Sequence, residues 1–246
     1  MTPARRLKFK RHALKAAGAL VGAILLVFAL DRLFPPPIEW AGALSVVAED
    51  RNGRALRAFP VENGRWRLAA DLDRIDPAFI EALLTIEDQR FYDHPGVDPL
   101  AVIRASAQAV SRGRIVSGAS TITMQTARLL EPRPRTLPSK IIESIRALQL
   151  EARLSKDEIL ELYLTLAPYG GNLQGVRAAS WAWFGREPDA LTPDQIALLI
   201  ALPQSPEARR PDLRPDIARR ARAAILSRLA EAGWISAARA EDAASE

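Results

Sequence analysis

The sequence contains no cysteine in its 246 residues, which excludes a fold held together by disulfide bonds. The absence is compatible with an oxidising compartment and does not establish one. Proline and glycine are well represented, with 18 and 13 residues spread along the chain, a pattern that favours helices with firm ends over disorder. A chain of this length can bury a full hydrophobic core and form one domain with a small appendage.

Acidic residues are absent from residues 1–15, which hold six basic ones: Arg5, Arg6, Lys8, Lys10, Arg11 and Lys15. Because the net charge of the whole chain is +5, the rest of the chain sums to about −1. The positive charge is therefore a property of the tail. Basic residues elsewhere gather on one loop and give no extended face that could follow nucleic-acid phosphates. We therefore expect no nucleic-acid partner.

Charged residues are also absent from residues 16–30, AAGALVGAILLVFAL. A helix needs about 20 residues to cross the hydrocarbon core of a bilayer, and the apolar character continues more weakly to residue 34. A cleaved signal peptide is the alternative, but no small-x-small cleavage pattern follows the run. We therefore predict one transmembrane helix at 16–34, with the tail in the cytoplasm and everything after Pro35 outside.

Strand signals are scarce. Residues 44–59, LSVVAEDRNGRALRAF, place Asn52 and Gly53 between two β-tolerant segments and predict a hairpin. The remaining periodicity is helical. It predicts helices at residues 76–92, 99–111, 120–130, 138–154, 156–166, 174–184, 193–202 and 215–232. Two helix starts carry capping-box patterns, Ser155 with Glu158 and Thr192 with Gln195.

The fold class is therefore mainly α. We divide the chain into a basic cytoplasmic tail at 1–15, the anchor, a stalk with the short hairpin at 35–68, and a helical domain at 69–235. The segment EPRPRTLPS at 131–139 carries three prolines and predicts an extended, mobile loop. Residues 236–246 indicate a frayed tail or a linker stub.

An ionisable residue interrupts the apolar stripe of the predicted helix 76–92. Glu87 falls among Ile80, Leu83, Leu84 and Phe91, which recur at helical spacing. Apolar neighbours disfavour the charged form of a carboxylate and make it a better proton acceptor near neutral pH, which is the condition for a general base. The alternative is that Glu87 lies at the rim of the stripe and pairs with Arg90.

A second carboxylate lies near an unusual supply of cations. Glu143 shares a helical face with Lys140, and four cations fall within thirteen residues: Arg128, Arg133, Arg135 and Lys140. Guanidinium groups suit a polyanion such as pyrophosphate, because each can bind two oxygens. A solvated basic loop with a surface ion pair is the alternative. Between the two carboxylates, SGASTITMQ offers small and hydroxylated residues at a helix start.

The segments EDQRFYDHPG, GASTITMQ, SKIIE and ILELYLTLAPYGGNLQGVRAASWAWFG, in this order and at these intervals, resemble the peptidoglycan glycosyltransferases of glycosyltransferase family 51. The resemblance extends from about residue 70 to residue 235. It implies a lysozyme-like helical glycosyltransferase domain with a small membrane-associated lobe. Residues 97–115, apolar with scattered arginines, are our candidate for that lobe.

The resemblance implies a role for each matching residue. Glu87 matches the general base that takes the proton from the 4-hydroxyl of the acceptor sugar, Asp88 matches a second acid that organises the site, and Glu143 matches a second catalytic carboxylate near the donor. Four cations match positions that hold the pyrophosphate of the donor or line its cleft: Arg104, Arg128, Arg135 and Lys140. Three further residues would position substrate in the cleft: Ser120, Thr121 and Gln125.

The implied reaction polymerises lipid II into β-1,4-linked glycan with inversion and releases undecaprenyl pyrophosphate. Magnesium is the implied cofactor, with no ligand assigned. Implied partners are lipid II, the growing glycan chain, membrane lipid and other wall-synthesis proteins, at the bacterial inner membrane with the domain facing the periplasm or exterior. A lipid II-binding scaffold of low activity is the alternative. A lytic muramidase is disfavoured, because cleaving a glycoside does not need four cations near one carboxylate.

Several positions depart from the pattern of the family. Thr165 stands for a usual asparagine, which would reduce activity if that asparagine orders the cleft, and Ser139 for a common arginine, which thins the donor-side charge. Gln195 replaces a glutamate and should cap its helix equally well. His94 should fix the DHPG turn structurally. The chain has neither the Ser-x-x-Lys nor the Lys-Thr/Ser-Gly pattern of a transpeptidase, so we expect either a monofunctional protein or a fragment of a bifunctional one.

Overall fold

The computed structural model describes residues 29, 31–38, 42–51, 55–112 and 120–245. The chain divides into two compact units, Met1–Pro36 and Pro37–Glu246, and the elements below belong to the second. The predicted anchor at 16–34 falls almost entirely outside the described residues. Among the residues that are described, no helix combines the length and apolar character needed to cross a membrane.

The predicted hairpin is confirmed. Strand β1 (Val46–Glu49) pairs antiparallel with β2 (Ala55–Phe59), and the turn residues Asn52 and Gly53 lie outside the described residues. A second pair, β3 (Trp66–Arg67) with β4 (Leu173–Gln174), is parallel and was not predicted, because two-residue strands carry no readable alternation. The side chain of Arg67 donates to Gln174 Oε1 through Nε at 2.9 Å and Nη2 at 2.8 Å and fastens this pair.

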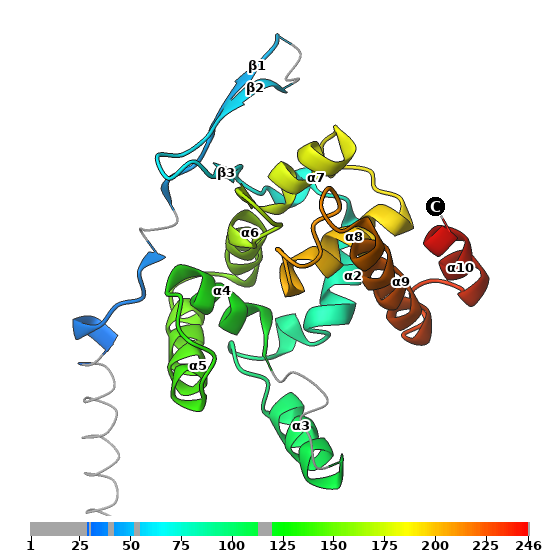
Figure 1. The fold of residues 1–246 in the computed structure, drawn as a ribbon. Helices are drawn as coiled ribbons and strands as arrows, with labels where there is room; N and C mark the ends of the chain where they lie inside the picture. Colours follow the sequence, from blue (N-terminus) through cyan, green and yellow to red (C-terminus); the bar gives the residue numbers. More distant parts are fainter. Residues whose placement is uncertain (1–28, 30, 39–41, 52–54, 113–119, 246) are drawn as a thin grey trace, which may run out of the picture. The chain divides into compact units, whose positions relative to one another are not determined.

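Helices make up most of the unit (Figure 1). They are α2 (Pro77–Glu87), α3 (Pro99–Arg112), α4 (Ile122–Leu130), α5 (Leu137–Glu151), α6 (Lys156–Leu166), α7 (Val176–Phe184), α8 (Pro193–Ala201), α9 (Pro215–Glu231) and α10 (Ala237–Ser245), with 3₁₀ turns η2 (Leu72–Arg74), η3 (Phe91–Asp93) and η4 (Leu202–Gln204). The helical periodicity thus located α2 to α9 to within a few residues.

One predicted helix is too long. Residues 76–92 do not form one helix, because α2 ends at Glu87 and Asp88 leaves the helical conformation with φ −161°. The chain then makes the short turn η3. The two capping boxes predicted from the sequence are present. Ser155 and Glu158 form the capping box of α6, and Gln195 Oε1 accepts from the Thr192 backbone N–H at 3.2 Å at the start of α8.

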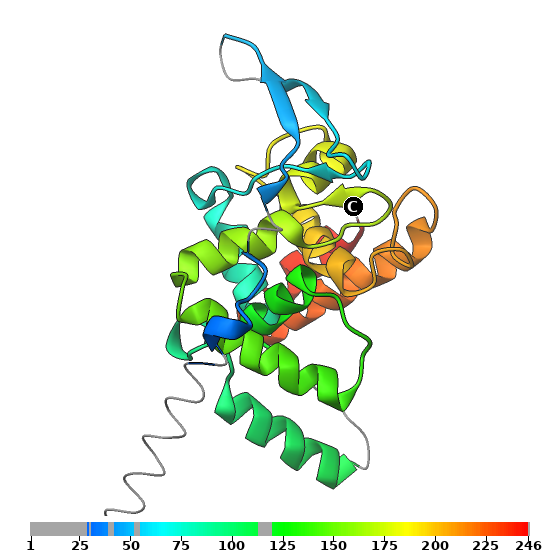
Figure 2. The ribbon, with the colours of Figure 1, turned by 90° about the vertical axis from the view of Figure 1, so that its left-hand side faces the viewer.

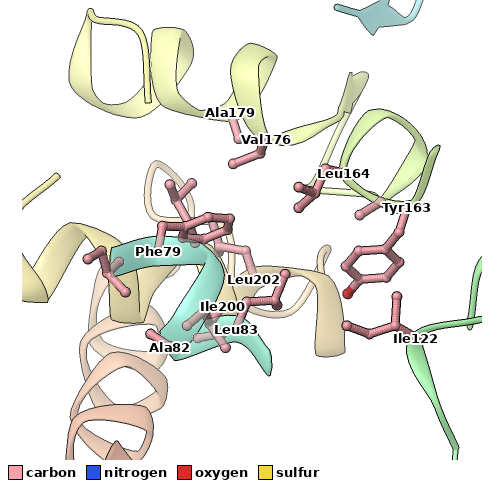
Figure 3. Close-up of a cluster of buried hydrophobic side chains, with 14 of the residues drawn as sticks. Phe79, Ala82, Leu83, Ile122, Tyr163, Leu164, Val176, Ala179, Ile200 and Leu202 are labelled. Carbon is pink, nitrogen blue, oxygen red and sulfur yellow. The ribbon is translucent and has the colours of Figure 1, made fainter. Parts of the chain in front are cut away.

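The hydrophobic core is centred on α8. Its residues Ile196, Leu199 and Ile200 are buried, and α8 packs against α9, α2 and α7. Figure 3 shows Phe79 and Leu83 of α2 beside Ile200. These contacts fix the C-terminal end of α2 against η4, which follows α8 directly.

The predicted frayed tail is wrong. Residues 237–245 form α10, which packs against α9 and α8. Two small residues on one face, Ala240 and Ala243, are buried against them, and Arg222 Nη2 donates to the Ala244 carbonyl at 3.1 Å. The sequence did not predict this helix because its buried side consists of alanines, which are only weakly hydrophobic.

Helix α4 lies between α5 and α6 and packs against both. A partly buried cluster of hydrogen bonds joins them. Lys156 donates to Glu151 Oε1 at 2.7 Å and to the His94 carbonyl at 2.6 Å, and Thr123 donates to the same Glu151 oxygen at 2.6 Å. Within this unit α3 lies at the end opposite the hairpin (Figures 1 and 2).

Candidate active site

Glu87 is the last residue of α2 and is only partly buried. Gln125 Nε2 donates to its Oε2 at 3.0 Å, and Gln204 Nε2 donates to its Oε1 at 2.8 Å. The alternative pairing with Arg90 is not formed, because Arg90 binds Asp98 instead, with Nε 3.2 Å from Oδ2. The carboxylate is therefore oriented by two neutral amides, one on each oxygen. The sequence had suggested either apolar neighbours or a pairing with Arg90, and neither amide contact was predicted.

Asp88 is buried and joins the end of α2 to the start of α4. Its Oδ2 accepts from the Ile122 backbone N–H at 2.9 Å, and its Oδ1 lies 3.0 Å from His94 Nε2. His94 Nδ1 accepts from the Gly96 N–H at 3.2 Å, so the ring proton is on Nε2 and is donated to Asp88. Both side chains thus hold the turn that follows η3 against the start of α4.

Thr121 ties the same turn to α4. It caps that helix by accepting from the Met124 N–H at 3.1 Å, and its hydroxyl donates to the Gly96 carbonyl at 2.5 Å. Gly96 has a φ of +91°, and a Cβ there would lie 2.9 Å from the Ala147 carbonyl of α5. Thr121 therefore supports the backbone that surrounds the site.

The second carboxylate, Glu143, is 5% exposed on α5, and no donor among the described residues bonds to it. Lys140, one turn earlier, donates to Ser120 Oγ. Burial lowers the pKa of Lys140; the positive charge of Arg128 lowers it further, whereas the negative charge of Glu143 raises it. Lys140, Glu143 and Arg128 are therefore close enough to act on one another.

Tyr163 of α6 connects the two carboxylate regions. The pKa of its buried hydroxyl is raised well above its usual range, first by burial and then by the negative charge of Glu87, and the positive charge of Arg128 opposes this. Glu87 and Arg128 thus both lie within electrostatic range of one side chain, which sits beside Ile122 of α4 (Figure 3). Tyr163 therefore lies between Glu87, at the end of α2, and Arg128 of α4, in the sense that the charge of each acts on its hydroxyl.

The cationic cluster is smaller than the sequence suggested. Arg133 binds Glu131, which also accepts from Arg146 Nε at 2.9 Å, so one of the four cations is neutralised. Arg104 on α3 and Arg135 after α4 are exposed, and within the described part of the chain neither makes a hydrogen bond or ion pair. The sequence prediction counted the cations and left out Glu131, which lies two residues from Arg133.

The departures from the family pattern are accommodated. The hydroxyl of Thr165, buried on α6, accepts from the Ala70 backbone N–H at 3.0 Å. Ser139 is buried at the start of α5, and its hydroxyl lies 2.9 Å from that of Thr136. Each of the two hydroxyl groups therefore has a hydrogen-bond partner in the structure.

Gln204 is the contact to Glu87 that sequence reasoning missed. It lies in η4, and Arg209 Nη1 donates to its Oε1 at 2.9 Å. Gln204 lies in the segment ALPQSPEARRPD at residues 201–212, which has no periodicity or motif that sequence reasoning could assign to a site. The same segment closes over the PYGG turn: a Cβ at Gly170 would lie 2.9 Å from the Pro206 carbonyl.

The sequence model of the family described as Transglycosylase matches residues 52–230, well over half of the chain. The chain belongs to the transglycosylase family. Penicillin-binding protein 1C of Escherichia coli K12 is 47% identical over 210 residues, and penicillin-binding protein 1A of the same strain is 42% identical over 172 residues. These matches confirm the resemblance drawn from the motif blocks, and the helical architecture confirms the mainly α class.

This transglycosylase chain corresponds to only part of those relatives. The match to penicillin-binding protein 1C covers 85% of this chain and 27% of that protein, and the match to penicillin-binding protein 1A covers 69% and 20%. The crystal structure of penicillin-binding protein 1A from Haemophilus influenzae aligns with a TM-score of 0.45 and 18% identity, covering 83% of this chain and 20% of that one. We draw no conclusion about fold or function from a structural likeness of this size.

Proposed function

We propose that this chain is a peptidoglycan glycosyltransferase that polymerises lipid II into β-1,4-linked glycan strands and releases undecaprenyl pyrophosphate. The observation that supports the proposal is that the structure holds two carboxylates in different settings. Glu87 is partly exposed and oriented by two amides, and Glu143 is buried within electrostatic range of Lys140, on which Arg128 also acts. Family membership supports the same conclusion.

The chemistry is a direct displacement. Glu87 removes the proton from the 4-hydroxyl of the acceptor sugar, and that oxygen attacks the anomeric carbon of the donor as its bond to pyrophosphate breaks. Each carboxylate oxygen has two lone pairs, so Glu87 can accept this proton while the two amides hold it. Attack opposite the leaving group inverts the anomeric configuration, as in inverting glycosidases.

The leaving group needs positive charge more than it needs a proton. Lys140 and Arg128 provide it, with Ser120 fixing the Lys140 ammonium group. Arg135 and Arg104, both exposed, are free to reach a bound pyrophosphate. Magnesium binds through one or two carboxylates together with substrate phosphates, and Glu143 fits that requirement. The ion would supply further charge to the departing pyrophosphate.

The proposal also assigns a membrane-facing surface. Four residues on one side of α5 are 49–81% exposed although all are apolar: Leu137, Ile141, Ile145 and Leu148. On α3, in the segment predicted as the membrane-associated lobe, Leu100, Val102 and Ile103 are 41–64% exposed. A bilayer surface would cover such residues and deliver the lipid-linked substrate. We therefore propose the inner membrane as the site of action, with the domain on its outer side.

Purified chain supplied with lipid II and magnesium should make glycan polymer, and Glu87→Gln should abolish it while lipid II binding persists. Arg219→Met, which removes an exposed ion pair with Asp216 on α9, is the control and should retain activity. Polymer formation unaffected by Glu87→Gln would refute the assignment of the base. Lipid II binding without any polymer from the unmodified chain would favour the scaffold alternative, and recovery of activity in Thr165→Asn would trace the loss to that position.

A further inference from the structure

We propose that Gln204 and Arg209 are positioning residues for the general base: Arg209 fixes the amide of Gln204 so that its NH₂ group orients the carboxylate of Glu87. The inference rests on the role proposed for Glu87 and extends it to a segment 117 residues away. Neither residue is expected to touch the reacting sugars.

The chemistry of the three groups permits only one arrangement. A guanidinium group has donors and no acceptor, and an ionised carboxylate has acceptors and no donor. Arg209 Nη1 lies 2.9 Å from Gln204 Oε1, and Gln204 Nε2 lies 2.8 Å from Glu87 Oε1. Turning the amide over would set NH₂ against guanidinium and carbonyl against carboxylate. Arg209 thereby dictates that Gln204 presents a donor to Glu87.

Arg209 is itself anchored to the core. The same Nη1 donates to the carbonyl of Ala201, the last residue of α8, at 2.6 Å. The orientation of Gln204 is thus fixed relative to α8, whose residues Ile196, Leu199 and Ile200 are buried in the core. On the other side, Gln125 of α4 donates to Glu87 Oε2 at 3.0 Å. Glu87 is consequently clamped between two elements that reach it from different parts of the chain.

The location of the clamp indicates a functional rather than a stabilising role. Gln204 is exposed, and an exposed hydrogen bond adds little to folding stability because water replaces it readily. A small misplacement of a catalytic group, in contrast, costs a large factor in rate. Removing the clamp should therefore lower turnover and leave the fold and the affinity for substrate nearly unchanged.

Two substitutions of Gln204 separate orientation of Glu87 from mere contact with Arg209. Gln204→Glu keeps an acceptor for Arg209 and strengthens that bond, but it replaces the donor facing Glu87 by a negative charge. Gln204→Met removes both contacts at similar volume. Arg209→Met leaves the amide free to turn over. The control is again Arg219→Met, because that arginine is exposed on α9 and pairs only with Asp216 among the described residues.

The measurement is kcat and KM for lipid II polymerisation by the full chain, together with the melting temperature of each variant. We expect kcat to fall about 10- to 100-fold in Gln204→Glu and Gln204→Met, and less in Arg209→Met, with KM and melting temperature close to those of the unmodified chain. Unchanged kcat in Gln204→Glu would overturn this inference while leaving the proposed function intact. A rise in KM at constant kcat would also overturn it, since it would make Gln204 a substrate-binding residue. An unmodified chain that binds lipid II and never polymerises it would remove both the proposed function and this inference.

Discussion

At the scale of single residues, Lys140 shows how burial and neighbouring charges set the properties of one group. Burial lowers the pKa of its ammonium group, Arg128 lowers it further, and Glu143 raises it. Only the ammonium form attracts a pyrophosphate. Because its pKa is lowered, Lys140 loses its proton, and with it its positive charge, at a lower pH than an ordinary lysine.

Substitution of the two neighbours should move the titration of Lys140 in opposite directions. Arg128→Met removes a positive charge and should raise the pKa of Lys140, whereas Glu143→Gln removes a negative charge and should lower it further. An NMR titration of the labelled lysine side chain measures both shifts without requiring activity. Shifts of the same sign in the two variants would contradict the arrangement of charges described here.

The residues of the site divide by how far their contacts extend along the chain. Asp88, His94 and Gly96 lie within nine residues of one another, and the sequence predicted a structural role for His94 in this segment but not its contact with Asp88. The bond between Glu87 and Gln204 joins positions 117 residues apart, and no local pattern encodes it. The bond from Arg146 of α5 to Glu131 spans 15 residues and depends on how the intervening loop folds, whereas Arg133 and Glu131 are only two residues apart. Residue types indicated the chemistry, and tertiary packing decided which of them meet.

At the scale of elements, the turn after η3 is held against α5 with no space to spare. Gly96→Ala should destabilise the fold by about 2–4 kcal/mol, because a Cβ would lie 2.9 Å from the Ala147 carbonyl and φ is +91°. Gly64→Ala is the matched control: its φ is +74°, but nothing lies within 4 Å of the added Cβ, so it should cost only about 1 kcal/mol. Denaturant unfolding measures both, and equal losses would show that contact with α5 is unimportant.

Helix α10 tests whether small buried residues hold an element in place. Ala243 is 2% exposed against the neighbouring helices, so Ala243→Glu should cost about 2 kcal/mol or more by forcing a charge into an apolar contact. Ala238→Glu on the exposed side of the same helix should change stability by less than about 0.5 kcal/mol. The comparison by thermal unfolding measures how much more a glutamate costs on the buried side of α10 than on its exposed side. If both variants were equally stable, α10 would not be docked.

At the scale of the whole molecule, the helical periodicity located most elements and missed those whose buried residues are only weakly hydrophobic or that are very short. Helices α2 to α9 carry apolar stripes or caps that sequence reasoning could read, whereas α10 buries alanines and β3 and β4 have two residues each. The exposed apolar side of α5 was also not predicted, because apolar residues at helical spacing are normally expected to face the core. Helix α5 therefore has a buried carboxylate, Glu143, on one side and two exposed apolar residues, Ile141 and Ile145, on the other.

The proposed membrane contact of α5 can be tested directly, since the chain contains no cysteine and a single label can therefore be placed without removing native residues. Ile145→Cys, at a position 52% exposed on α5, should carry a fluorophore that is quenched by brominated acyl chains when the full chain is reconstituted in lipid vesicles. Leu56→Cys is the control, because Leu56 is 70% exposed on β2, at the end of the unit opposite α3 (Figures 1 and 2). The predicted anchor brings both labels to the vesicle equally, so only the difference between them reports which surface meets the bilayer. Equal quenching of the two labels, or stronger quenching at Leu56→Cys, would show that α5 does not face the lipid, and its apolar residues would then need a protein partner to cover them.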